Sequence, residues 1–302
     1  MRDFVVCLKS DTFKTFRCIK AAQSQDINVE EKNTHEKRIS ADIDSPFDIG
    51  LIVGSSGSGK TTLAREMFKD KFVEKSILDP NKAIIDQFPK EWTYDQCQTA
   101  LSSIGLTSVP CWIREAKTLS NGQRFRAEVA LQCAYASDDI VIIDEWTSVV
   151  DRTVAKVMSH CVQKFARSQN KKIILLSCHY DVTDWLQPDW IVDCNADTFE
   201  CRRSLPKART EHLELEIREC SPKYWKLFSK YHYLSHNLCG GKNICFGLFL
   251  KDDDQKIIGL GMYSNYVPGK MEIVHSNRVV IHPDYCGMNI AAKFVDTTAE
   301  EM

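Results

Sequence analysis

Continuous apolar runs, each bounded by polar residues, recur through the first two thirds of the chain. They fall at residues 49–53, 140–143 and 173–176. An apolar run without polar alternation is typical of a parallel strand that is covered on both faces. Segments with helical character, such as residues 61–69, lie between these runs. The alternation predicts an α/β fold with a parallel sheet in this part of the chain.

The N-terminal stretch ahead of the first run has a different pattern. Residues 4–8 and 15–19 have the composition of β-strands, whereas the charged stretch 30–38 has that of a solvated loop. We therefore expect short antiparallel strands before the parallel sheet.

The sequence pattern changes near residue 204, which divides the chain into two parts. Residues 204–212 predict a linker, which leaves a first domain at 1–203 and a second at 213–302. In the second domain, Ser221 followed by Pro222 is a typical helix start, with a cap residue and then proline in the first turn.

The rest of the second domain predicts a small α/β unit. Two β-rich segments at 246–250 and 257–262 flank a polar turn and predict a hairpin. A strand at 278–281 and a helix at 290–302 follow. Because the chain ends within that helix, we expect this domain to be incomplete.

Composition narrows the class of protein. The chain has 302 residues, of which 43% are hydrophobic and 26% charged, as in globular proteins. Its formal net charge of -2 excludes a global basic field for nucleic acid, although a local patch is compatible with it. The N-terminus lacks the apolar core of a signal peptide, and no stretch approaches the ~20 apolar residues that span a bilayer. We expect a cytoplasmic protein without a transport channel of its own.

Thirteen cysteines are scattered along the chain without paired spacing. In a cytosolic chain of this length, reduced thiols that are buried as small apolar groups are expected. Structural zinc is the alternative, with Cys194 and Cys201, or Cys239 and Cys245, as its ligands. Neither pair has the close spacing of a zinc knuckle.

A glycine-rich loop follows the first apolar run. Residues 54–61 read Gly-Ser-Ser-Gly-Ser-Gly-Lys-Thr and match the Walker A pattern between a strand and a helix. The glycines let backbone N–H groups face a phosphate, and the helix start adds a favourable dipole. Lys60 should reach the β- and γ-phosphates of ATP, and the Thr61 hydroxyl should bind Mg²⁺. A flexible Gly/Ser turn is the alternative, and it leaves the Lys-Thr pair in register unexplained.

The second apolar run ends in two carboxylates. Asp144 and Glu145 follow residues 140–143 and resemble the Walker B motif. Asp144 is placed to hold the shell of Mg²⁺, and Glu145 to orient or deprotonate the attacking water. An apolar run that ends in Asp-Glu is weak evidence for a Walker B motif by itself, but it is strong evidence when a Walker A loop precedes it.

Residues 119–123 read Leu-Ser-Asn-Gly-Gln and closely resemble the signature of ABC-type ATPases, with Asn121 in place of a glycine. Asparagine tolerates left-handed backbone conformations, so the change is conservative for the backbone. In that family the signature of one subunit closes over the γ-phosphate bound by another. The resemblance implies a homodimer with ATP at its interface, to which the Ser120 hydroxyl and the following helix start contribute.

Shorter matches to the ABC family follow in order. Residues 148–151 resemble the D-loop, which touches the partner subunit, and His179 resembles the switch histidine that contacts the γ-phosphate. A structural role is the alternative for this histidine. Gln87 is the candidate for the glutamine of the Q-loop. Phe13 or Phe16 could stack on the adenine, but core packing explains either equally well.

The resemblance covers residues 1–203 and implies a P-loop NTPase of ABC type. The nucleotide-binding residues it implies are Gly54, Ser55, Gly57, Ser58, Gly59, Lys60, Thr61, Thr62, Gln87, Ser120, Gly122, Gln123 and Asp144. The Mg²⁺ ligands it implies are Thr61, Gln87 and Asp144, and the catalytic residues are Glu145 and His179. Only 59 positions separate Lys60 from Leu119, which is short for a transporter ATPase. This spacing favours soluble ABC relatives that act on nucleic acids or other macromolecules.

Residues 278–292 resemble motif A of the GNAT acyltransferases, in which a strand leads into a turn and a helix start. Cys286 and Asn289 depart from the usual residues of that turn, whereas Ala291 matches. The resemblance implies a partial GNAT-like α/β domain that binds acyl-CoA. Its pyrophosphate would lie at the backbone of Val280, Gly287, Asn289 and Ala291.

Residues 231–235 and 245–247 resemble a GNAT-like branch that includes the phage DNA-modification protein Mom. That branch modifies adenine, so the acyl acceptor would be an amine, with a nucleobase as one candidate. The alternative is that Tyr231, His232 and Tyr233 end an amphipathic helix and pack on the sheet.

Two other functions fit the same motifs. The ATPase could be a slow switch with a non-catalytic C-terminal binding module, as the departures at Cys286 and Asn289 suggest. It could also be an ABC subunit that docks on a separate membrane protein, although the short spacing between the motifs disfavours this.

Overall fold

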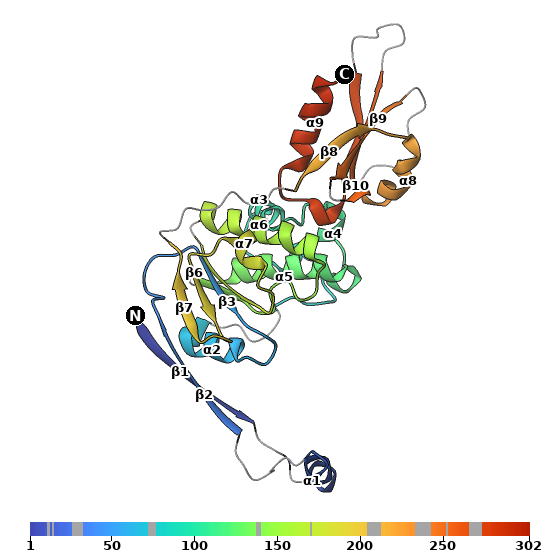
Figure 1. Ribbon diagram of the computed structural model, residues 1–302. Coiled ribbons are helices and arrows are strands. Elements are labelled where there is room, and N and C mark those ends of the chain that lie inside the picture. The colour runs from blue at the N-terminus through green and yellow to red at the C-terminus, as the bar shows by residue number, and fades with distance from the viewer. Residues whose placement is uncertain are drawn as a thin grey trace.

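The computed structural model has a mixed α/β fold (Figure 1). The described residues are 1–10, 13, 15–25, 33–71, 77–136, 140–169, 171–203, 213–232, 243–251, 253–265 and 274–302. Within them the strands form sheets of two, five and four strands.

The five-stranded sheet lies at the centre of the first part of the chain. Its strands are β3 (Ile49–Val53), β4 (Ile140–Ile143), β5 (Lys172–Ser177), β6 (Trp190–Asp193) and β7 (Thr198–Cys201). Their order is β4-β5-β3-β6-β7, with the first four parallel and β7 antiparallel to β6. The strands that were predicted from the three apolar runs are confirmed.

Helices cover both faces of this sheet, which explains why its strands lack polar alternation. The helices of this part are α2 (Lys60–Phe68), α3 (Tyr94–Ser103), α4 (Val109–Trp112), α5 (Asn121–Tyr135), α6 (Arg152–Gln169) and α7 (Val182–Leu186). Leu51 packs in one core cluster with residues of α3, α5 and α6, whereas Ile52 packs in another with residues of α2. Adjacent residues of one strand thus face opposite layers.

The N-terminal strands form a long hairpin that projects from this core. β1 (Arg2–Ser10) pairs antiparallel with β2 (Asn33–Ala41), and α1 (Phe16–Gln23) lies at the outer end (Figure 1). The strand predicted at residues 15–19 is wrong. The Thr15 side chain accepts a hydrogen bond from the Cys18 backbone N–H at 3.3 Å and caps a helix there.

The solvated loop predicted at residues 30–38 is also wrong where the chain is described. Residues 33–38 belong to β2, because pairing with β1 outweighs their charged composition. Residues 30–32 lie outside the described part.

The four-stranded sheet is built from the C-terminal part of the chain. β8 (Leu215–Glu219), β9 (Asn243–Leu250), β10 (Asp253–Asn265) and β11 (Val274–Ile281) lie antiparallel in the order β11-β10-β9-β8. The predicted hairpin, the strand at 278–281 and the final helix α9 (Ile290–Glu300) are confirmed. At Ser221 the predicted helix is a series of short turns that includes α8 (Trp225–Phe228).

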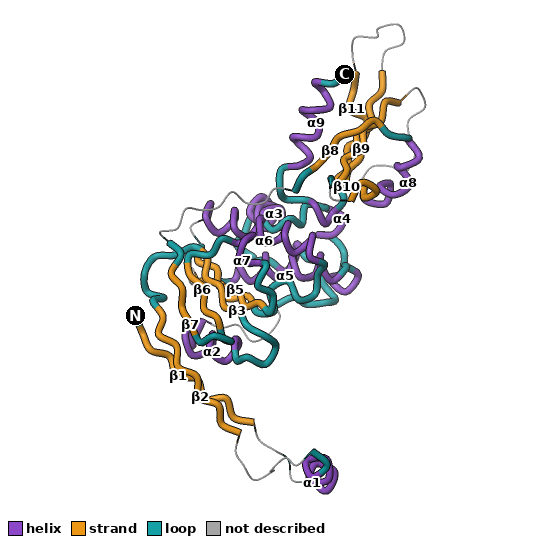
Figure 2. The backbone as a smooth tube through the Cα atoms, viewed as in Figure 1, coloured by secondary structure: helices purple, strands orange, loops and turns teal. Residues whose placement is uncertain are grey.

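This C-terminal part packs against α6, away from the hairpin (Figure 2). Val157 and Cys161 of α6 share a core cluster with Phe246 and Leu248 of β9. The predicted linker at 204–212 lies outside the described residues. No helix in the described ranges is both long and apolar enough to cross a membrane.

Candidate functional site

The carboxyl ends of the four parallel strands meet at one edge of the central sheet. Parallel strands bring the segments that follow them to the same side, which is where α/β sheets hold ligands. Gly54 follows β3, Asp144 follows β4, His179 lies just after β5, and Asn195 lies just after β6. Residues far apart in the sequence therefore surround one turn, the loop between β3 and α2.

The loop between β3 and α2 closes around a buried amine. Lys60 is 6% exposed, and its Nζ donates hydrogen bonds to the carbonyl oxygens of Gly54 and Ser55, each at 2.9 Å. Gly59 stands at the N-cap of α2 in the left-handed region, with φ of 90°. Gly57 has φ of 79°, which favours glycine, and a Cβ built there would meet nothing within 4 Å. The loop is therefore open toward the outside at Gly57.

A hydroxyl and a carboxylate meet beside this loop. Thr61 Oγ1 donates a hydrogen bond to Asp144 Oδ2 at 2.8 Å, although 83 positions separate the two residues. The other carboxylate oxygen, Asp144 Oδ1, accepts from the backbone N–H of Glu145 at 2.8 Å. Hydroxyl and carboxylate oxygens are ligands that Mg²⁺ prefers, so this pair fits a magnesium ion.

Ser58 provides a second test of fit. Its Oγ is buried and has no hydrogen-bond partner among the residues that the structure describes. A buried hydroxyl without a partner costs free energy unless a ligand or water supplies one. Phosphate oxygens are suitable acceptors, so Ser58 and Lys60 together suit a phosphate group.

Glu145 lies next to Asp144 in an unusual backbone conformation. Its φ is 54°, and its carboxylate Oε2 accepts a hydrogen bond from Ser148 Oγ at 2.6 Å. A positive φ is uncommon for residues other than glycine and is found at functional sites. The turn holds this carboxylate exposed at the sheet edge, where water can reach it.

His179 is half-buried and is positioned by its backbone. Its N–H donates to Ser177 Oγ at 3.1 Å, and that hydroxyl donates to the carbonyl oxygen of Trp146 at 3.2 Å. The segments after β4 and β5 are therefore tied together by one buried serine.

The predicted signature residues begin α5. Ser120 Oγ accepts from the Gln123 N–H at 3.3 Å, and Gln123 Oε1 accepts from the Ser120 N–H at 3.2 Å, which makes a capping box. Ser120 is exposed, and a Cβ built on Gly122 would lie 3.5 Å from Val150 Cγ1. The start of α5 thus faces solvent beside the predicted D-loop.

Gln87 is engaged in its own loop. Its Oε1 accepts from the Asp79 N–H at 2.7 Å, and its Nε2 donates to the carbonyl oxygens of Asp79 and Lys82 at 3.0 and 3.1 Å. With both ends of the amide used, this side chain is not directed at the Thr61–Asp144 pair in this conformation. Its Mg²⁺ role stays a prediction.

Phe13 and Phe16 are both 77% exposed, and α1 lies at the far end of the hairpin from α2 (Figure 1). The alternative of core packing is wrong for both residues. The arrangement provides no contact between either ring and the Walker A loop. The predicted ligand residue Thr62 lies exposed in the first turn of α2.

A polar network that the sequence did not reveal joins the loop after β6 to the Walker A loop. Asn195 Oδ1 accepts from both the N–H and the hydroxyl of Ser55, at 3.2 and 3.0 Å. Asn195 Nδ2 donates to Tyr180 Oη at 3.0 Å, and Tyr180 Oη donates to Asp193 Oδ1 at 3.0 Å. Partial burial and the Asp193 hydrogen bond raise the pKa of Tyr180, so it stays a donor. The position of Asn195 just after a parallel strand is the signal that could have identified it.

The residues predicted at acyl-CoA are spread over β11 and the start of α9. Val280 pairs with Leu260 in the sheet and its side chain is buried. Asn289 is exposed, has φ of 60° and is the N-cap of α9, whose first turn contains Ala291. Gly287 packs against the first part of the chain: a Cβ there would lie 2.7 Å from Cys161 Sγ and 2.8 Å from Gly105 Cα.

A cavity of about 330 Å³ lies beside Gly287, between α3 and α6. Apart from Phe165, its lining is polar and contains the Lys164 amine. The other lining side chains are Gln98, Thr99, Ser102, Ser103 and Ser168.

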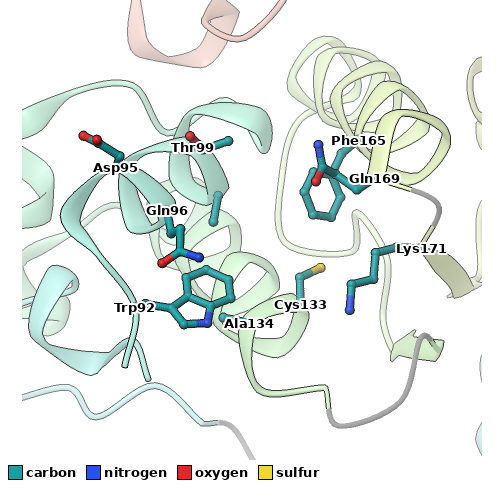
Figure 3. Close-up of a pocket in the computed structure, with 10 residues that line it drawn as sticks. Trp92, Asp95, Gln96, Thr99, Cys133, Ala134, Phe165, Gln169 and Lys171 are labelled. Carbon is teal, nitrogen blue, oxygen red and sulfur yellow. The ribbon is translucent and has the colours of Figure 1, made fainter. Parts of the chain in front are cut away.

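A second cavity, of about 380 Å³, lies between α3, α5 and α6. Trp92 and Phe165 stand on opposite sides of it, and Cys133 lies between them (Figure 3). Burial raises the pKa of Cys133 to about 12, so this thiol is neutral. None of the residues predicted at the nucleotide lines this cavity.

The predicted zinc pairs do not form a described cluster. Cys194 is buried and Cys201 is exposed, and Cys239 lies outside the described residues. Burial raises the pKa of Cys194 to about 11.

Comparison with solved structures finds similarity to ABC cassettes. The chain is similar to the dimeric bacterial ABC transporter cassette MJ0796, with 14% identity and a TM-score of 0.43 over 62% of this chain and 94% of that one. It is similar to cbiO1 from Clostridium perfringens, with 14% identity and a TM-score of 0.42 over 66% and 88%. It is also similar to a putative cobalt transport ATP-binding protein, with 18% identity and a TM-score of 0.44 over 72% and 84%.

No model of a known protein family matches this sequence, and no curated protein does. The structural similarities are low, so the function has to be inferred from the site itself.

Proposed function

We propose that residues 1–203 form an ABC-type ATPase that binds and hydrolyses ATP. The observation that carries the proposal is the 2.8 Å contact between Thr61 and Asp144, next to the buried Lys60. A strand–loop–helix turn with a buried lysine, a hydroxyl and a carboxylate is the arrangement that binds a nucleoside triphosphate with Mg²⁺.

Each residue of the turn has a chemical role in this proposal. Lys60 would exchange its two carbonyl partners for phosphate oxygens, and Ser58 would donate its hydroxyl to one of them. Thr61 and Asp144 would hold Mg²⁺, which offsets the charge of the phosphates when bound.

Glu145 and His179 would act at the terminal phosphate. The Glu145 carboxylate would accept a hydrogen bond from water and orient it for attack, after release from Ser148. Ser177 hydrogen-bonds to both Trp146 and His179, and these bonds would hold His179 in a fixed position relative to the segment after β4.

The exposed start of α5 supports a dimer with ATP at its interface. The capping box uses the Ser120 hydroxyl and the backbone N–H groups of Ser120 and Gln123, whereas the helix start still offers a positive dipole end. A nucleotide on a second copy of this chain would meet that end. The homodimer would therefore form only when nucleotide is bound.

The test is self-association of the full chain with Glu145→Gln, measured by light scattering with and without Mg²⁺-ATP. A dimer that appears only with nucleotide supports the proposal. The matched control adds Ser120→Arg, which should bind ATP and stay monomeric. A Glu145→Gln protein that binds ATP and remains monomeric would restrict the function to nucleotide binding, and repeating the titration with DNA would detect a nucleic-acid partner.

A second candidate function concerns residues 213–302, taken as a domain joined through 204–212. The polar cavity beside Gly287 favours acyl-CoA binding there, because Lys164 and several hydroxyls could meet its phosphates next to the start of α9. The domain would then be GNAT-like and transfer an acyl group to an amine, with a nucleobase as a candidate acceptor.

Calorimetry with acetyl-CoA tests this second candidate. Lys164→Glu should abolish most of the binding, whereas Lys226→Glu, a change at an exposed lysine of α8, should leave it unchanged. If the unmodified chain binds no acyl-CoA, this second candidate function is wrong.

A further inference from the structure

A fully buried arginine of the signature helix reaches the C-terminal part of the chain. Arg126 lies six positions after Ser120, about 9 Å along α5 at the rise of an α-helix. Its side chain is 0% exposed, although it carries a charge. A charge is buried at high cost unless it is paired and hydrogen-bonded.

Among the described residues, the hydrogen-bond and ion-pair partners of Arg126 come from the 3-10 helix η6 (Pro283–Tyr285). Nη1 donates to the Pro283 carbonyl oxygen at 3.2 Å, and Nη2 donates to the Asp284 carbonyl oxygen at 3.3 Å. The Asp284 carboxylate lies 3.7 Å from Nη1. The guanidinium thus clamps the turn between β11 and α9 from the opposite part of the molecule.

This clamp is surrounded by close packing that leaves little freedom to slide. A Cβ on Gly105 would lie 2.8 Å from the Cys286 carbonyl oxygen, and one on Gly287 would lie 2.8 Å from Gly105 Cα. Densely packed contacts pass a displacement on instead of absorbing it. Movement of α5 would therefore move η6.

The predicted D-loop lies beside the same clamp. A Cβ built on Gly122 of the signature would lie 3.5 Å from Val150 Cγ1. The Asp151 carboxylate caps α6 by accepting from the N–H groups of Thr153 and Val154 at 3.0 Å. Asp151 is close enough for its charge to raise the pKa of Arg126 and of Tyr285, although desolvation is the larger influence on each and lowers that of Arg126.

On the far side, η6 leads to a hydrogen-bonded pair. The Asp284 N–H donates to His282 Nδ1 at 3.3 Å, and His282 Nε2 shares a hydrogen bond with Tyr231 Oη at 3.1 Å. Burial lowers the pKa of His282, and the charges of Lys230, Lys256 and Arg126 lower it further, whereas Asp284 raises it. Two hydrogen bonds, from Arg126 to Asp284 and from Asp284 to His282, thus connect Arg126 to the Tyr231–His282 pair.

We propose that Arg126 couples nucleotide-driven movement of the signature helix to η6 and to the Tyr231–His282 pair. The coupling rests on the proposed ATPase function. It works in both directions, because a ligand that shifts η6 must alter nucleotide affinity by the same factor as nucleotide alters that ligand's affinity.

Hydrogen exchange measured by mass spectrometry on the full chain tests this coupling. In Glu145→Gln, Mg²⁺-ATP should slow exchange in peptides that cover the Walker A loop and also in those that cover η6 and residues 229–231. The second effect should be about fivefold or more, the low end of allosteric couplings. Adding Arg126→Met should keep the first effect and abolish the second.

The controls separate coupling from loss of folding. Arg167→Met is matched, since Arg167 of α6 donates to the Gln187 carbonyl oxygen within the first part of the chain, and both effects should persist. Asp284→Asn keeps both carbonyl acceptors and should weaken the second effect without abolishing it. This variant replaces Arg126→Met as the test if Arg126→Met does not fold.

Two results would overturn the inference. One is a response of η6 that survives Arg126→Met, and the other is a Walker A response in Glu145→Gln without any response of η6. If Mg²⁺-ATP changes nothing at the Walker A loop, the proposed ATPase function fails and this inference fails with it.

Discussion

Two glycine-containing turns of this molecule have the same local design and different surroundings. The loop at Gly57 and the turn at Gly287 each connect a strand to a helix, and each has a glycine with positive φ, of 79° and 97°. At Gly57 a Cβ would meet nothing within 4 Å, whereas at Gly287 it would collide with Cys161 Sγ and Gly105 Cα.

The difference supports the ligand site that we propose at the first turn, which stays accessible and has matching side chains. The first turn is accompanied by Lys60, Thr61 and Asp144. At the second turn, the glycine and the Cys286 carbonyl serve an interface inside the protein. A local sequence pattern can predict the turn, but the residues packed around it determine whether a ligand can reach it.

The largest effect that we expect is on ATP turnover at the first turn. Glu145→Gln removes the carboxylate that would orient water, so ATP turnover should fall about 10²–10⁴-fold, the usual contribution of general acid–base catalysis. Steady-state phosphate release measures it, and Glu200→Gln on β7 should be silent. Unchanged turnover in Glu145→Gln would remove Glu145 from the proposed site.

A direct comparison of the two turns is the next in size. Gly287→Ala should lower the free energy of unfolding by about 2–5 kcal/mol, because it adds a steric clash to an unfavourable left-handed conformation. Gly57→Ala carries only the conformational cost of about 1–2 kcal/mol. Urea unfolding of both variants measures this, and equal losses would contradict the difference in packing.

The polar network behind the first turn should have a smaller effect. Asn195→Ala removes the acceptor of both Ser55 hydrogen bonds, so ATP affinity should fall about fivefold, the equivalent of about 1 kcal/mol. Nucleotide titration by fluorescence measures it. Unchanged ATP affinity in Asn195→Ala would show that the Ser55 contacts do not matter.

The smallest effect concerns the end of β2 and depends on pH. The Ser45 hydrogen bond, with help from Arg203, lowers the pKa of Asp42 from 3.8 to about 2. A lowered pKa in the folded state contributes stability that is present above pH 3.8 and is lost as the pH falls toward 2. Asp42→Asn should lower the thermal midpoint slightly at neutral pH and flatten its fall between pH 4 and pH 2. Parallel curves for both proteins would exclude this contribution.

The parts of the fold that sequence predicted are those in which one short segment carries the information. Residues 49–53 and 140–143 are apolar throughout because both faces are buried, and that pattern needs no knowledge of neighbours. The predictions of a strand at residues 15–19 and of a loop at residues 33–38 were wrong, because the composition of these segments does not distinguish one structure from another. A capped helix start at Thr15 and the pairing of β2 with β1 decided their structures.

The candidate site divides in the same way. The order of Lys60, Thr61, Asp144 and Glu145 in recognisable motifs predicted a nucleotide site from the sequence alone. The packing of Gly287, the Asn195 network and the burial of Arg126 were visible only in the tertiary structure. Motifs are read along the chain, because a phosphate loop folds locally. Contacts between segments more than 100 positions apart depend on how the sheets and helices pack, and no local pattern encodes them.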